Sequence, residues 1–171
     1  MVRRDPFLAV MVLCLSLALP AWAGAADAPA SDSAAGSVKN ISGPATVARG
    51  GAAPMALKRG DRIFEKDVLV TGKDASLGLI LRDDTTLALG PGSRLVVERF
   101  LFEPAKGNLA QVLRITRGSM ATVSGEIVKL NPNVARVETP LYSIGIRGTH
   151  FLLNLESTGE ELTGKGEEGA Q

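Results

Sequence analysis

The feature that most constrains the fold is a series of short apolar runs that recur about every ten residues, each closed by glycine, proline, asparagine or aspartate. The clearest run is Asp67-Val-Leu-Val-Thr-Gly72, and Ala75–Arg82 and Thr85–Gly90 follow it with Asp83-Asp84 at the turn between them. Runs of this kind are typical of an all-β sandwich, barrel or roll. The sequence predicts further strands at Ala45–Arg49, Ser93–Phe100, Leu109–Ile115, Glu126–Leu130, Ala135–Thr139 and Thr149–Leu155.

No segment makes a good case for a helix. Residues 109–116 place apolar side chains at helical spacing, but Gly107 and Gly118 confine them and their β-branched content favours a strand. A weak repetition relates Gly60–Gly72, Lys73–Gly90 and Pro91–Gly107. These units could stack as rungs of a small β-solenoid-like roll. A β-sandwich of short strands would give a similar pattern, so both architectures stay open.

The N-terminus is typical of a secretory signal peptide. Arg3 and Arg4 precede an apolar run from Phe7 to Leu19, and small residues, Ala21 and Ala23, stand where a signal peptidase cuts. The run is too short for the roughly 30 Å hydrocarbon core of a membrane, which disfavours the alternative of an uncleaved anchor. We expect cleavage after Ala23, a mature chain without a membrane span, and a location in the periplasm or outside the cell.

Three segments are expected after the signal peptide. Residues 24–36 are rich in alanine, serine, aspartate and proline without an apolar period, and we expect a flexible linker. Residues 37–156 hold all the predicted strands and form one domain. Residues 157–171 are acidic and glycine-rich, and we expect this tail to be disordered.

The residue content argues against several functions. Cys14 is the only cysteine and lies within the signal peptide, so the mature chain has no disulfide and no thiolate chemistry. The chain carries 19 basic and 18 acidic residues without a basic run, which disfavours nucleic-acid binding. His150 is the only histidine, and alone it is a weak basis for a zinc site. We therefore expect a non-enzymatic protein with no cofactor and no metal.

Aspartates recur near the glycines. They could bind calcium as in glycine-aspartate β-rolls, but a regular nonapeptide repeat is missing. Capping of turns by side chain to backbone hydrogen bonds is favoured. The residues concerned are Asp61, Asp67, Asp74, Asp83 and Asp84.

Three motifs in order resemble the FecR domain, over roughly residues 40–155. The first is Gly60-Asp61-Arg-Ile-Phe-Glu-Lys-Asp67-Val-Leu-Val-Thr71, and the second runs from Gly78 through Asp83 to Ser93. The third is Ile144-Gly145-Ile-Arg147-Gly148-Thr149-His-Phe151. Asp84 departs from the family pattern, which has glycine there; either the turn does not require positive φ, or aspartate tolerates it.

The resemblance implies a small all-β domain that acts outside the cytoplasm. The best-known members are membrane regulators of ferric-siderophore uptake with a cytoplasmic region that binds a sigma factor. Only six residues precede the apolar segment here, so we do not carry over an anti-sigma role. We expect the sensory or scaffold domain alone, exported as a separate protein.

Two hypotheses of function follow, and a third is weaker. The first is a module that binds another protein or a glycan of the bacterial cell envelope. The second is a signalling regulator that cleaves itself at Gly148-Thr149, as the resemblance implies: the Thr149 hydroxyl attacks the Gly148 carbonyl, with His150 as a base. The third, an enzyme acting on envelope polymers, would require convergent carboxylates that the sequence does not show.

The closing motif also has a purely structural interpretation, which we favour. Gly145 and Gly148 would shape a turn, and Thr149 and Phe151 would be ordinary strand residues. Arg147 could bind a carboxylate or phosphate, but an ion pair or a clamp on loop carbonyls is the favoured role.

Overall fold

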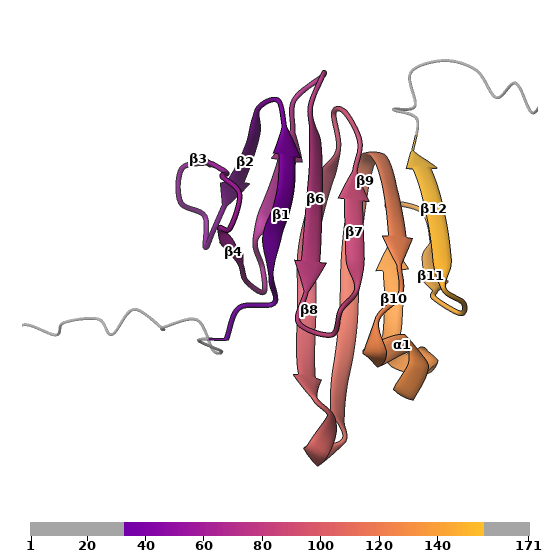
Figure 1. The fold of residues 1–171 in the computed structure, drawn as a ribbon. Coiled ribbons are helices and arrows are strands. Elements are labelled where there is room, and N and C mark those ends of the chain that lie inside the picture. Colours follow the sequence, from indigo (N-terminus) through magenta and orange to yellow (C-terminus); the bar gives the residue numbers. More distant parts are fainter. Residues whose placement is uncertain (1–32, 156–171) are drawn as a thin grey trace, which may run out of the picture. The chain divides into compact units, whose positions relative to one another are not determined.

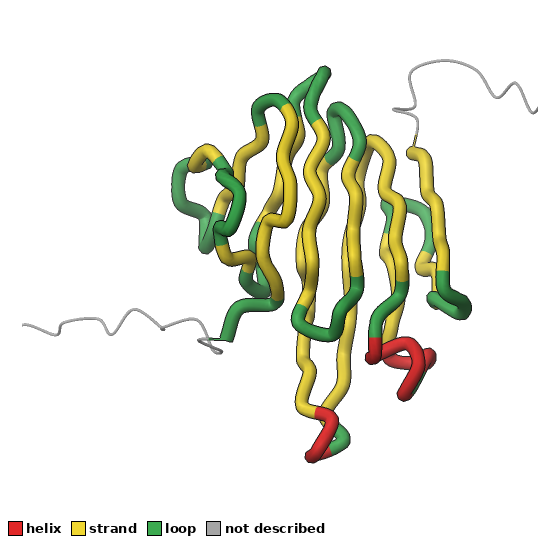
Figure 2. Tube along the Cα trace, viewed as in Figure 1, coloured by secondary structure: helices red, strands yellow, loops and turns green. Residues whose placement is uncertain are grey.

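The computed structural model describes residues 33–155. The expected signal peptide, most of the expected linker and the expected tail lie outside these residues. Within them strands dominate and the helical segments are short, so the all-β prediction is confirmed (Figure 1 and Figure 2). The first strand, β1 (Gly36–Ser42), begins at the residue where we expected the linker to end.

Residues 33–155 form a single twelve-stranded sheet that curls into two layers. Neighbouring strands are antiparallel, except that β9 and β10 are parallel. The first layer contains, in spatial order, β4 (Arg62–Ile63), β1, β6 (Ser76–Leu81), β7 (Thr86–Leu89), the end of β9 (Asn108–Val123) and β12 (His150–Leu155). The second contains β3 (Met55–Ala56), β2 (Ala45–Ala48), β5 (Val68–Thr71), β8 (Arg94–Glu103), the start of β9, β10 (Ala135–Glu138) and β11 (Ser143–Gly145).

Strand β9 belongs to both layers. Its residues 108–117 pair with β8, and residues 118–123 pair with β12. The change of layer falls at Gly118, whose φ of 82° is a conformation that glycine adopts without strain. A Cβ at Gly118 would also stand 2.5 Å from the Cα of Ser93, so the layers can join here only at a residue without a side chain.

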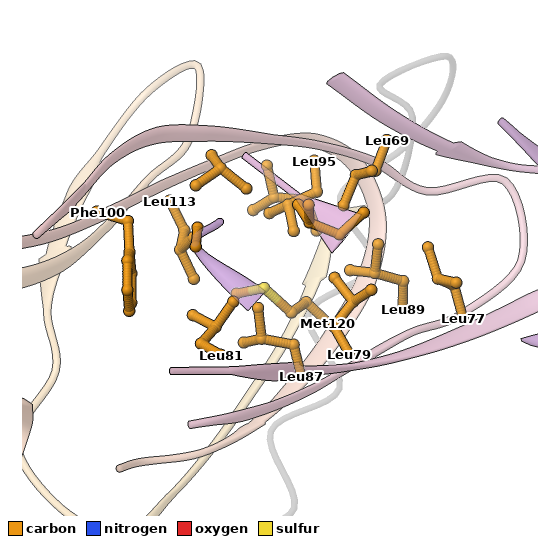
Figure 3. Packing of buried hydrophobic residues seen from close by; sticks show 14 of the residues in the cluster. Leu69, Leu77, Leu79, Leu81, Leu87, Leu89, Leu95, Phe100, Leu113 and Met120 are labelled. Carbon is orange, nitrogen blue, oxygen red and sulfur yellow. The ribbon is translucent and has the colours of Figure 1, made fainter. Parts of the chain in front are cut away.

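The core fills the space between the layers. Leu69, Leu95 and Leu113 of the second layer face a set of leucines and Met120 of the first layer (Figure 3). Along β6 and β7 burial alternates residue by residue, as expected for strands with one face on a core. Each of these side chains contributes on the order of 1.5–3 kcal/mol when fully buried. The first-layer members shown are Leu77, Leu79, Leu81, Leu87 and Leu89.

Two predictions about the fold are wrong. Residues Glu126–Leu130, expected as a strand, form the helix α1, although no helix was expected. The units proposed as stacked rungs do not stack: β5 pairs with β2 and β8, while β6 pairs with β1 and β7. The hydrogen bonds run between antiparallel neighbours instead of between equivalent rungs. Two short 3₁₀ turns, Pro104–Lys106 and Pro132–Val134, are the other helical segments of the described part of the chain.

Candidate functional site

The closing motif connects the two layers at one end of the sheet. Its first residues form β11, and Ile146 then packs into the core while its N–H donates to the Ala135 carbonyl at 3.1 Å. The chain turns through Gly148 and enters β12 at His150. Phe151 is half-buried against the core. Burial of Ile146 and Phe151 thus anchors both sides of the turn.

The Gly148-Thr149 peptide lies at that turn beside Ser124. The Ser124 hydroxyl donates to the Gly148 carbonyl at 2.8 Å, and the Ser124 N–H donates to the Thr149 carbonyl at 2.8 Å. Gly148 has φ of 126°, which L-residues with a side chain rarely adopt. Sequence reasoning missed Ser124, because it lies 24 residues before Gly148 and belongs to none of the recognised motifs.

The other polar residues of the closing motif are exposed. Arg147 donates to the side-chain carbonyl of Asn133 at 3.2 Å, and it forms no ion pair within the described part of the chain. His150 is exposed on the first layer. Gly145 stands in open space with room for a side chain. Residues 33–155 contain no group of three metal-binding side chains.

Asp67 of the first motif is the centre of a buried polar cluster. Its carboxylate accepts from Nε and Nη2 of Arg49, each at 2.8 Å, and from the N–H of Phe64 at 2.8 Å. The guanidinium also lies over the Phe64 ring, 4.3 Å from its centroid. The hydrogen bond to Asp67 raises the pKa of Arg49 above its usual value. The cluster ties the end of β2 to the turn before β5.

A second cluster joins Thr71 and Ser93. The Thr71 hydroxyl donates to the Gly90 carbonyl at 2.7 Å and accepts from the Ser93 N–H at 2.8 Å. The Ser93 hydroxyl accepts from the Ser119 N–H at 3.0 Å, next to the layer change at Gly118. These two hydroxyls therefore hold the turn between β7 and β8 against β5 and β9.

A third cluster surrounds Asp83, which is fully buried. Its carboxylate accepts from the N–H and the hydroxyl of Thr85, at 3.2 and 2.8 Å, and the Thr85 hydroxyl accepts from the Gly125 N–H at 3.0 Å. The Asp83 carbonyl accepts from the N–H of Glu126, the first residue of α1, at 2.7 Å. The β6–β7 turn thereby holds the start of the helix.

Asp84, next to this cluster, has φ of 63°. The turn at this position does have positive φ, so the alternative of a turn without it is wrong, and aspartate adopts the conformation. Gly60 has φ of 90°, and Asp61 accepts the Lys58 N–H at 2.7 Å. Asp74 is exposed. The side-chain hydrogen bonds of residues 33–155 do not join the three clusters to one another or to the closing motif, so the predicted site residues do not converge on one centre.

A charged network covers part of the second layer. Arg114 contacts Glu98 at 3.2 Å and Glu138 at 2.8 Å, and Glu138 also contacts Arg136 at 3.2 Å. The hydrogen bonds from Arg114 and then Arg136 lower the pKa of Glu138, and the bond to Glu138 raises the pKa of Arg114. Each charge faces an opposite charge, which is the arrangement of a stabilising surface network.

The opposite surface, the outer face of the first layer, has a different character. Cross-strand pairing aligns two rows of uncharged side chains across it. Two adjoining grooves of about 490 and 320 Å³ follow these rows and share Thr86 and Ala88. Lys39 and Arg59 line the far end of the larger groove. The first row is Asn40, Gly78, Ala88, Ala121 and Leu152. The second row is Ser37, Ile80, Thr86, Val123 and His150.

The curled sheet is a small all-β domain. In its three polar clusters, side chains of the first two sequence motifs form hydrogen bonds that hold turns against neighbouring segments. The family described as FecR protein matches residues 67–170, more than half of the 171-residue chain, and the chain belongs to this family. The match begins at Asp67, so Gly60 and Asp61 lie before it. Searches of the curated proteins and of the solved structures find no match. Of the described helices, none has the length and apolar content to cross a membrane.

Proposed function

We propose that the chain is an exported, non-enzymatic FecR-family module that binds a protein partner in the bacterial cell envelope. The observation that carries this proposal is the outer face of the first layer, with its two adjoining grooves. Ala88 and Ala121 at its centre are exposed, and no acidic residue lines either groove. Contiguous exposed apolar residues mark protein interaction sites, and Ala88, Ala121 and Leu152 form such a row across this face.

The groove chemistry favours a protein over a glycan. The lining mixes aliphatic residues with uncharged polar ones such as Asn40 and Thr86, and it offers no tryptophan or tyrosine ring on which a sugar could stack. Lys39 and Arg59 belong to the larger groove alone. This surface fits a segment of a partner protein that places apolar side chains on the alanines and a carboxylate near the two basic residues. We propose the periplasm as the location, as the signal-peptide pattern indicates.

Site-specific photocrosslinking tests the proposal in cells that export the chain. A photoreactive amino acid at position 88 should give one adduct of defined mass, whereas the same group at Ala105, exposed in the turn after β8, should give none. The double substitution Lys39→Glu and Arg59→Glu should weaken the adduct at position 88. Equal adducts at both positions would contradict the proposal. Co-sedimentation with purified peptidoglycan would point to a glycan ligand instead.

The self-cleaving regulator remains a second candidate because of Ser124. Its hydroxyl donates to the carbonyl that the Thr149 hydroxyl would attack, and a donor at that position would stabilise the developing oxyanion. The attack would form an ester and free the Thr149 amino group, and water would then hydrolyse the ester. Intact-mass measurement of the purified chain tests this candidate. A break after Gly148 that Thr149→Ala abolishes and Ser124→Ala slows would support it, and a single intact mass would end it.

A further inference from the structure

We propose that the free edge of β12 pairs antiparallel with β12 of a second copy of this chain, with Leu152 at the twofold axis. Within residues 33–155, β12 pairs with β9 on one side and with no strand on the other. Figure 1 shows it as the last strand of the first layer. The pairing would use the free backbone groups of this edge, where the outer face ends at His150 and Leu152, whereas the proposed partner site is centred two strands away on Ala88; the pairing can therefore fail while the proposed function stands.

The register with β9 determines which backbone groups are free. The Ser124 N–H donates to the Thr149 carbonyl, and His150, Leu152 and Asn154 lie opposite Val123, Ala121 and Ser119. In an antiparallel pair, residues that bond to one neighbour alternate with residues whose backbone groups point the other way. The N–H and C=O groups of Phe151, Leu153 and Leu155 therefore face β9. Those of His150, Leu152 and Asn154 face outward from the sheet.

This edge lacks the features that prevent strand pairing in other proteins. The strand His150–Leu155 contains no proline, lysine, arginine, aspartate or glutamate, and its register with β9 has no bulge. The other end strands of the described sheet are two or three residues long: β3, β4 and β11. Strand β12, with six residues, is the one long and unprotected edge among them.

The side chains of β12 are self-complementary about Leu152. Antiparallel pairing centred there places Leu152 opposite its counterpart and His150 opposite Asn154 of the second copy. These are the residues with outward-facing backbone groups, so three pairs exchange six hydrogen bonds. On the inner face, Phe151 meets Leu153 of the second copy, and both are half-buried in one chain. From His150 to Asn154 the strand has a polar residue at each end and three apolar residues between them. This order reads the same in both directions, so it fits an antiparallel second copy of the same strand better than an unrelated strand.

The pairing would cover exposed apolar surface. Leu152 is 75% exposed in the single chain, and at the twofold axis it would pack against its counterpart. Edge-to-edge contact of six residues buries less than the ~1,200 Å² of a stable protein complex, so the dimer should dissociate on dilution. The central row of the outer face, through Ala88 and Ala121, would continue into the second copy.

Cross-linking tests the register. Paired residues that exchange hydrogen bonds have Cα atoms about 5.5 Å apart, within the range that a disulfide can bridge. In a Cys14→Ala background, which contains no other cysteine, Leu152→Cys should give a disulfide-linked dimer under mild oxidation. Ala88→Cys, on the same exposed face but two strands from the edge, should stay monomeric. Equal cross-linking of both variants, or none at position 152, would overturn the proposal.

Sedimentation velocity of the exported chain tests the association itself. The chain should show a monomer–dimer equilibrium that Leu152→Lys weakens at least tenfold, because two ammonium groups would meet at the axis. Ala88→Lys, the same change of charge on the same face, should leave the equilibrium unchanged. A chain that is monomeric at all concentrations would refute the pairing. Dimers that form only when the chain is ended at Leu155 would refute it too, since residues 156–171 would then be the occupant of the edge.

Discussion

Replacement of Asp67 by alanine removes a carboxylate that accepts three hydrogen bonds inside the domain. Asp67 is fully buried, whereas the Arg49 side chain is 40% exposed, so water can replace part of what the arginine loses. A hydrogen bond to a charged group contributes about 1.5–3 kcal/mol. We count the hydrogen bond from the Phe64 N–H in full. The two hydrogen bonds from Arg49 count only in part, because the arginine is partly exposed to water. Together they give a decrease in the free energy of unfolding of about 3 kcal/mol. Breaking a buried ion pair costs about 3–5 kcal/mol, so this estimate lies at the lower end.

Urea denaturation followed by circular dichroism measures this loss. With a slope of about 2 kcal/mol per molar urea, the midpoint should fall by about 1.5 M. Asp61→Ala is the matched control, because it removes a carboxylate that accepts one N–H, that of Lys58, at the surface. That variant should lose about 1 kcal/mol. If the two variants have equal free energies of unfolding, the Asp67 cluster does not stabilise the domain as argued.

The remaining predictions concern the layer change, the charged network and the core. Gly118→Ala should lower the free energy of unfolding by about 3 kcal/mol, since positive φ and the contact with Ser93 both oppose a side chain. Gly107→Ala, with φ of 70° and open space around it, should lose about 1 kcal/mol in the same urea titration. The pKa of Glu138, followed by NMR, should lie below 4.5 and return toward that value in Arg114→Ala. Because the folded-state pKa is the lower one, its contribution to stability is complete above about pH 4.5 and is lost as the pH falls through the folded pKa. Gln111→Met should raise the free energy of unfolding by about 1 kcal/mol, because Gln111 is fully buried and its amide has no protein partner among the described residues; a loss in calorimetry would contradict this.

The strands that the sequence predicts well are those with one face on the core. In β6 and β7 every second residue is buried, so a local pattern of period two carries the information. Strand β9 is harder to predict because it changes layers at Gly118, and a glycine inside a strand resembles its end. Only the part of it from Leu109 to Ile115 was predicted.

Helix α1 and the Ser124 contact could not be predicted because distant residues determine them. The helix has five residues, too few for a helical period, and the Ile127 N–H finds its acceptor in Asp83, 44 residues earlier. Ser124 reaches Gly148 across 24 residues. The motif residues were recognisable as a set, but their roles in three separate clusters depend on which turns the fold brings together.

The passage of β9 through both layers has a consequence for how the domain unfolds. This one strand forms ladders with β7, β8, β10 and β12. If β9 were lost, strands of both layers would lose a hydrogen-bonded neighbour at the same time. Amide hydrogen exchange should therefore be slowest along β9 and should report a single cooperative opening instead of two. Most of these ladders join residues that are far apart in the sequence, such as Val123 of β9 and His150 of β12, so the ordering of β9 should limit the rate of folding.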